Sequence, residues 1–157
     1  MDLDIDRIVD HAVVWAVSKE GDTEYALHCL AFVEDAYERS NGIEIFGGDC
    51  ASESAHIYEA YRNKSEPPKG AFAFYDATGM IHGEMKNWGH VALCLGNNQV
   101  VHAWDKVRIE DYLLENICPS PGWSKPVFVG WAPPERVLQG CRQKQWVDCD
   151  GDDLCGS

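Results

Sequence analysis

The sequence predicts an α+β domain in which N-terminal helices pack on an antiparallel β-sheet. Apolar residues recur at helical spacing through the first 63 positions, whereas strand-like alternation begins near residue 70. Asn97-Asn98 separates two of the alternating runs and is a typical hairpin signal. Helices first and paired strands afterwards are the order expected of an α+β fold.

Three helices are expected before the sheet. The first carries Ile5, Ile8 and Val9 on one face, the second ends at the stop signal Asn41-Gly42, and the third has Ser52 as a candidate N-cap. Their expected ranges are about 4–18, 24–40 and 52–63.

The remaining chain is expected to form strands joined by turns. Strands are expected at 70–76, 90–96, 99–104 and 126–133, with a long loop at 78–89 and a short helix at 108–114. We expect residues 1–140 to form one domain, followed by an acidic, cysteine-containing tail at 141–157.

Composition limits the partners. The formal net charge is −13, which repels nucleic acid and anionic membrane surfaces, and we therefore expect neither as a partner. No apolar stretch is long enough to span a bilayer, and the N-terminus is acidic where a signal peptide is basic. The cell envelope or an extracellular location is expected if a signal was removed, and the cytoplasm otherwise. Composition leaves the oligomeric state open.

Seven cysteines, at positions 29, 50, 94, 118, 141, 149 and 155, leave two alternatives open. Up to three disulfides with one free thiol fit an oxidising compartment, and seven thiols fit a reducing one. No Cys/His spacing is typical of a zinc site. The run DCDGDD in the tail lacks the ligand spacing and closing Glu of a calcium loop, and we expect no metal there.

Cys29, His90 and His102 are the strongest candidates for chemistry. A cysteine hydrolase needs a thiol, an imidazole that takes its proton and a third group that orients this imidazole. Cys29 lies early in the second expected helix, where the helix dipole favours a thiolate. The hairpin at Asn97-Asn98 places His102 about level with His90 or Val91 on the neighbouring strand. The two imidazoles are therefore expected to lie close together.

The segment GHVALCLGNNQVVHAW resembles the NlpC/P60 pattern of His-Val at a strand start, a hairpin containing glycine, and a second His followed by Ala. HCLAFVEDAY resembles the nucleophile helix of that family, and KGAFAFYD resembles the strand before its histidine. The resemblance covers residues 8–138. Where many members have Asp-Cys-Ser-Gly, this chain has His28-Cys29-Leu30-Ala31, a departure that bears on the substrate more than on the chemistry.

The resemblance implies a papain-like core with Cys29 as nucleophile, His90 as base and His102 as the orienting residue. It also implies that the backbone N–H of Cys29 contributes to an oxyanion hole, and that no metal or cofactor is needed. The implied activity is cysteine peptidase or amidase hydrolysis of an amide bond through a thioester, most often in peptidoglycan stem peptides near D-glutamyl and diaminopimelyl residues.

Four further residues are predicted to bind substrate. Tyr25 offers a hydroxyl near the nucleophile, Asn87 and Trp88 precede His90, and Trp104 is predicted to share a strand face with His102 and to cover the imidazole. Each of these side chains is also a plausible structural residue. Cys94 shares a strand face with His90 but has no helix dipole to activate it, and we expect an inert thiol.

Two other functions remain open. A papain-like acyltransferase would use the same three residues and pass the acyl group to an amine or a lipid instead of water. A non-catalytic binding domain would keep the fold, and its Cys29 would have ordinary reactivity or form a disulfide.

Overall fold

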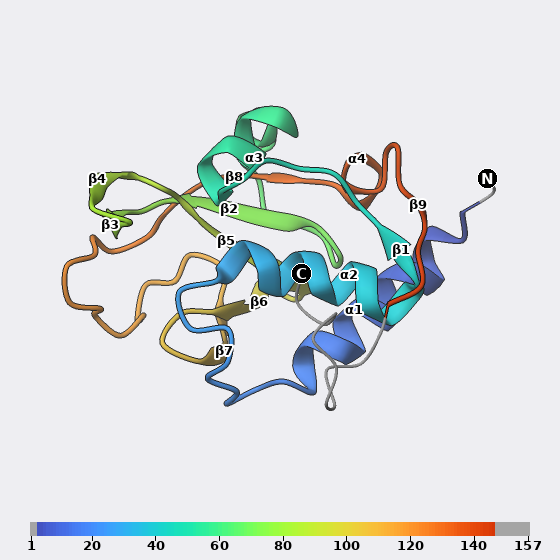
Figure 1. Cartoon of the computed structure of the whole chain (residues 1–157), viewed down its shortest axis with the longest axis horizontal. Helices are drawn as coiled ribbons and strands as arrows, with labels where there is room; N and C mark the ends of the chain where they lie inside the picture. Colours follow the sequence, from blue (N-terminus) through green and yellow to red (C-terminus); the bar gives the residue numbers. More distant parts are fainter. Residues whose placement is uncertain (1–2, 147–157) are drawn as a thin grey trace.

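A computed structural model describes residues 3–146 and contains a five-stranded antiparallel sheet with the strand order β7-β6-β5-β2-β8. Helices α1 and α2 pack side by side along this sheet (Figure 1). The elements are α1 (Ile5–Val17), α2 (Cys29–Asn41), β1 (Ile43–Glu44), α3 (Ala51–Ile57), the 3₁₀ helix η1 (Ala60–Arg62), β2 (Phe72–Asp76), β3 (Thr78–Ile81), β4 (Glu84–Asn87), β5 (His90–Gly96), β6 (Gln99–Ala103), β7 (Val107–Asp111), β8 (Val127–Ala132), α4 (Pro134–Val137) and β9 (Arg142–Gln143). The predicted α+β architecture is confirmed.

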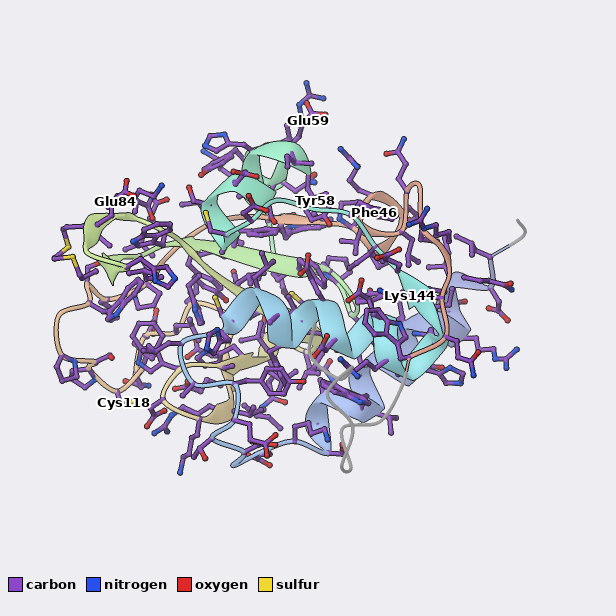
Figure 2. All side chains as sticks on the ribbon, in the orientation of Figure 1. Phe46, Tyr58, Glu59, Glu84, Cys118 and Lys144 are labelled. Atoms are coloured by element: carbon purple, nitrogen blue, oxygen red, sulfur yellow. The ribbon has the colours of Figure 1, made fainter. Side chains whose placement is uncertain are left out.

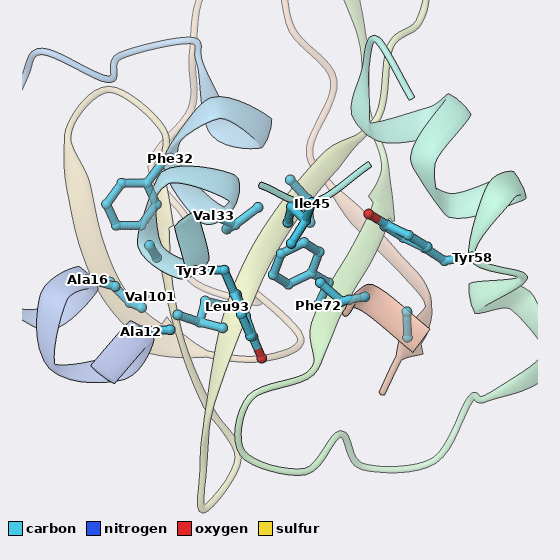
Figure 3. Packing of buried hydrophobic residues seen from close by; sticks show 14 of the residues in the cluster. Ala12, Ala16, Phe32, Val33, Tyr37, Ile45, Tyr58, Phe72, Leu93 and Val101 are labelled. Atoms are coloured by element: carbon cyan, nitrogen blue, oxygen red, sulfur yellow. The ribbon is translucent and has the colours of Figure 1, made fainter. Parts of the chain in front are cut away.

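The main core lies between the helices and one face of the sheet. Phe32 and Tyr37 of α2 pack toward Phe72 of β2 and Leu93 of β5, and all four side chains are fully buried (Figure 3). Alternation along β5 sends Ala92 and Cys94 to the opposite face, where a second apolar cluster forms under the chain between β7 and β8. His90 and His102 share this second face by the same alternation.

Helix α2 begins at Cys29 and not near residue 24 as predicted. Leu27 has a positive φ of 65°, and its backbone N–H donates to the carbonyl oxygen of Trp104. This contact holds the preceding residues in turns, because a residue at positive φ cannot continue a right-handed helix. Cys29 is therefore the first helical residue.

Three other predicted elements differ from the structure. The helix expected at 108–114 is the strand β7, which pairs with β6 along its length. The loop expected at 78–89 contains the hairpin β3–β4, whose turn has His82 and Gly83 at positive φ. The third helix stops at Ile57 because Glu59 has a φ of 56°, and a separate turn, η1, follows.

The first residues of the predicted tail pack on the domain. Strand β9 pairs with β1, and the Trp146 indole N–H donates to the carbonyl oxygen of Ile43. The DCDGDD run lies outside the described residues, and the boundary at residue 140 remains a prediction. Cysteines 29, 50, 94, 118 and 141 are free thiols in the structure. Within residues 3–146, none of the helices is long and apolar enough to cross a bilayer.

Candidate active site

Cys29 is placed by the N-terminus of α2. The thiol is half-buried, and the N-cap residue His28 makes no side-chain hydrogen bond to the first turn. The first N–H groups of a helix have no partner within the helix, so at this end they can donate to a ligand. Among the described cysteines, Cys29 is the one that begins a helix.

His90 and His102 are brought together by the β5–β6 hairpin. The register pairs Leu93 with Val101, and continuing it by one residue sets His102 beside Ala92. The two histidines are therefore diagonal neighbours on adjacent strands, rather than level as predicted. Nε2 of His90 lies 2.8 Å from Nδ1 of His102, and both rings are buried, with exposed fractions of 2% and 0%.

Glu110 extends this pair into a chain of three side chains. Its Oε2 lies 2.6 Å from Nε2 of His102. Glu110 lies on β7. In the register of β6 and β7, His102 pairs with Arg108, and Glu110 is two residues further along the same face. The sequence prediction missed Glu110 because it assigned 108–114 to a helix. The alternation of Val107 and Ile109 with Arg108 and Glu110 was the strand signal in this segment.

The thiol and the imidazole are both held in their neutral forms. Burial raises the pKa of Cys29 to about 11, although the backbone N–H groups of Val91, Leu30 and Cys29 favour the thiolate. Burial, followed by the neighbouring His102, holds the pKa of His90 well below its usual value. At neutral pH the free protein therefore pairs a thiol with an imidazole that retains a lone pair for accepting a proton.

Cys29 and His90 line the same cleft, whose volume is about 490 Å³. This volume is in the range of small-ligand sites. The hairpin β3–β4, marked by Glu84, and the chain around Cys118 lie at one end of the molecule (Figure 2). The hairpin contributes Ile81 and His82 to the cleft, and the chain after Cys118 contributes Trp123. The cleft is lined by Leu27, His28, Cys29, Leu30, Ala31, Glu34, Gly48, Asp49, Cys50, Ala51, Ile81, His82, Trp88, Gly89, His90, Ala103, Trp104 and Trp123.

Two of the four predicted substrate-binding residues line this cleft. Trp88 forms part of its wall, and the Trp104 ring meets the His90 ring edge-on, with 5.1 Å between ring centroids. The hydroxyl of Tyr25 instead donates to Asp35 at 2.7 Å. The Asn87 amide accepts from the Ala77 N–H and donates to Asp76. Tyr25 and Asn87 are absent from the cleft lining, and their side chains stabilise local structure.

A larger groove of about 670 Å³ lies between α1, the end of α2 and the segment near β9. Its histidine, His11, is bonded through Nδ1 to the Asn41 side chain. No cysteine lines it among the residues that the structure describes. Its described lining therefore lacks a thiol that would support hydrolysis.

Comparison with known families decides the classification. The sequence model of the NlpC/P60 family matches residues 15–126, which include Cys29, His90, His102 and Glu110. The chain belongs to the NlpC/P60 family. No curated protein sequence matches it significantly.

A solved NlpC/P60 structure shares the fold at low sequence identity. An NLP/P60-family protein from Staphylococcus aureus, described as similar to lipoprotein, is 19% identical with a TM-score of 0.53. It covers 85% of this chain, which spans 43% of that longer protein. The P60 domain of a Mycobacterium avium paratuberculosis antigen is 15% identical, with a TM-score of 0.48 and coverages of 83% and 95%. RipD from Mycobacterium tuberculosis, described as a non-catalytic domain adapted to peptidoglycan binding, is 16% identical, with a TM-score of 0.45 and coverages of 78% and 95%.

Glu34 is a cleft residue of this NlpC/P60 domain that the sequence prediction did not single out. It lies on α2, five residues after Cys29. Burial raises the pKa of this carboxyl to about 8, and Glu38 and Asp35 add to the effect. The wall therefore presents a largely neutral carboxyl at neutral pH. The described lining of the NlpC/P60 cleft includes no lysine or arginine.

The raised pKa of Cys29 predicts slow alkylation of the NlpC/P60 domain at neutral pH. Because the thiolate is the reacting species, the rate constant for iodoacetamide at Cys29 is expected to rise roughly tenfold per pH unit between pH 7 and 10. Peptide mapping after timed quenching would measure it. A fast rate at Cys29 that is already constant below pH 7 would instead show a preformed thiolate–imidazolium pair and contradict the neutral state.

Proposed function

We propose that this NlpC/P60 domain is a cysteine hydrolase that cleaves an amide bond through a thioester on Cys29. The observation that carries the proposal is the hydrogen-bonded chain His90–His102–Glu110, which ends in the cleft that contains the Cys29 thiol. A thiol, a neutral imidazole and a group that orients this imidazole are the parts that nucleophilic acyl transfer requires.

The first half of the reaction forms the acyl-enzyme. Nδ1 of His90 takes the thiol proton as the sulfur of Cys29 attacks the amide carbonyl carbon. The transfer accompanies the attack, because both groups are neutral in the free protein. The His90 imidazolium then donates this proton to the leaving amine, the C–N bond breaks, and a thioester remains.

The second half of the reaction releases the acid. His90 takes a proton from a water molecule, the resulting hydroxide attacks the thioester carbonyl, and the thiol leaves with the proton from His90. The oxyanion formed in each half is stabilised by the uncapped N–H groups at the start of α2, including that of Cys29. The helix dipole adds to this stabilisation.

A peptidoglycan stem peptide is the proposed substrate class. Membership of the NlpC/P60 family supports this class. The cleft volume of about 490 Å³ fits a few amino-acid residues of such a peptide. Trp88 and Trp104 supply apolar walls for the peptide stem. Leu30 and Ala31 follow the nucleophile and lie at the cleft, so their side chains limit the size of the group next to the scissile bond.

The direct test is product analysis on muropeptides of defined sequence. We expect two fragments separated at one amide bond, together with a thioester adduct on the Cys29 peptide after acid quenching, both detected by mass spectrometry. Cys118→Ser is the matched control, because Cys118 is also a half-buried free thiol but lies outside the cleft lining. This variant is expected to retain hydrolysis.

Two outcomes would contradict the hydrolase proposal. Transfer of the acyl fragment to an added amine or lipid, with no free acid formed, would identify an acyltransferase. Saturable muropeptide binding without fragments or an adduct would identify a binding domain.

A further inference from the structure

Glu110 directs its carboxylate at His102 and is not neutralised by another side chain. Within residues 3–146 it forms no ion pair with a lysine or an arginine. The nearest candidate on its own strand, Arg108, is held by two hydrogen bonds to Asp105, at 2.6 and 2.8 Å. The negative charge of Glu110 therefore acts mainly on the buried ring of His102.

The contact with Glu110 decides which nitrogen of His102 carries the proton. A carboxylate only accepts hydrogen bonds, so at 2.6 Å Nε2 of His102 must be the donor. In the neutral ring, Nδ1 of His102 is then an acceptor, and the bond of 2.8 Å to His90 requires the proton on Nε2 of His90. Nδ1 of His90 is left with a lone pair. This is the nitrogen that a general base toward Cys29 needs.

The opposite arrangement would disable the site. If Nδ1 of His102 carried the proton, it would donate to Nε2 of His90, and the neutral His90 ring would carry its own proton on Nδ1 and could not accept one from the thiol. That arrangement would also place two lone pairs, one on His102 and one on Glu110, against each other at 2.6 Å. While Glu110 is ionised and the His102 ring is neutral, the geometry therefore permits one direction of donation along the chain.

We propose that Glu110 is a positioning residue that fixes the tautomers of His102 and His90, and so keeps Nδ1 of His90 ready to accept the Cys29 proton. The inference rests on the proposed function for its kinetic consequence. The tautomers themselves do not depend on the reaction. Glu110 does not line the cleft and acts through the two rings.

The test substitutes glutamine for Glu110. An amide of the same shape either accepts or donates a hydrogen bond, so it no longer excludes the wrong tautomer. In the Ser-His-Asp triad, replacing the carboxylate that contacts the base directly by an amide lowers kcat about 10⁴-fold through a wrong tautomer. Glu110 acts on the base through His102, one residue further away, and we therefore expect Glu110→Gln to lower kcat about 10- to 100-fold. KM is expected to change less than about twofold, since Glu110 does not line the cleft.

Nitrogen-15 NMR of labelled histidines supplies the second readout. In the wild type we expect both rings to carry the proton on Nε2 and a lone pair on Nδ1. In Glu110→Gln we expect a second population with the proton on Nδ1 and the lone pair on Nε2. Asp111→Asn is the matched control: Asp111 is the next residue on β7, and its Oδ1 accepts a hydrogen bond from the Leu113 N–H, which an asparagine oxygen can also accept. Its kcat and histidine signals are expected to match those of the wild type. Thermal unfolding of each variant would report loss of fold.

The outcomes separate this inference from the proposed function. Absence of hydrolysis in the wild type, with the predicted tautomers that shift in Glu110→Gln, would reject the hydrolase and support the positioning role. Hydrolysis in a folded Glu110→Gln at the wild-type rate, with unchanged tautomers, would overturn the positioning role and leave the hydrolase in place. Equal loss of kcat in Glu110→Gln and Asp111→Asn would also overturn it.

Discussion

Replacing Cys29 with alanine is expected to lower kcat for muropeptide hydrolysis by at least about 1,000-fold. The variant removes the atom that forms the thioester, and only transition-state binding by the backbone N–H groups remains. The alanine side chain is smaller, so the start of α2 can keep its geometry. Initial rates of fragment formation, measured at saturating substrate, would check the prediction.

The matched variant His90→Ala removes the base and leaves the nucleophile in place. It should also lower kcat by about 1,000-fold or more, because residues of one catalytic unit fail together. Calorimetry is expected to show that Cys29→Ala still binds the muropeptide, since the other residues that line the cleft are unchanged. Hydrolysis by Cys29→Ala within tenfold of the wild-type rate would assign the chemistry to another group.

The sheet was predictable where local signals agree with tertiary packing. Alternating apolar residues gave the bounds of β5, and the Asn97-Asn98 turn, with both residues at positive φ, gave its pairing with β6. The same alternation put Cys94 beneath the site as a fully buried thiol. The proximity of His90 and His102 follows from this hairpin, because a tight turn fixes which residues of its two strands are neighbours.

The site could be predicted only in part, because two features depend on contacts between distant segments. The start of α2 is fixed by the bond from Leu27 to the Trp104 carbonyl, and no pattern within 24–40 indicates it. Glu110 reaches His102 only because β7 is the edge strand beside β6, whereas RIEDYLL taken alone also satisfies a helical pattern. The bond of the Tyr25 hydroxyl to Asp35 likewise depends on a residue ten positions away on α2.

Replacing Gly130 with alanine is expected to destabilise the domain by about 4 kcal/mol. Gly130 lies on β8 at the irregularity where the pairing with β2 shifts register between Phe74 and Tyr75, and its φ is 151°. A Cβ there would overlap the carbonyl oxygen of Ala60 in η1 and approach its carbonyl carbon to 2.8 Å. Backbone strain and overpacking each cost about 1–3 kcal/mol, and backbone atoms cannot move aside as a flexible side chain can.

The matched control is Gly122→Ala, which adds a methyl group at a φ of 79° with no heavy atom within 4 Å of the new Cβ. It should lose only about 1 kcal/mol, from backbone strain. Urea unfolding of both variants would give the difference in free energy. A loss of stability in Gly130→Ala no larger than in Gly122→Ala would mean that the Ala60 carbonyl of η1 does not limit the space beside Gly130 of β8.

The Gly130→Ala substitution should also affect the active site, because β8 pairs with β2, and Tyr75 of β2 packs on the His90 ring at 5.7 Å between centroids. Where Gly130→Ala remains folded, a displaced Tyr75 is therefore expected to lower kcat, whereas Gly122→Ala should leave it unchanged.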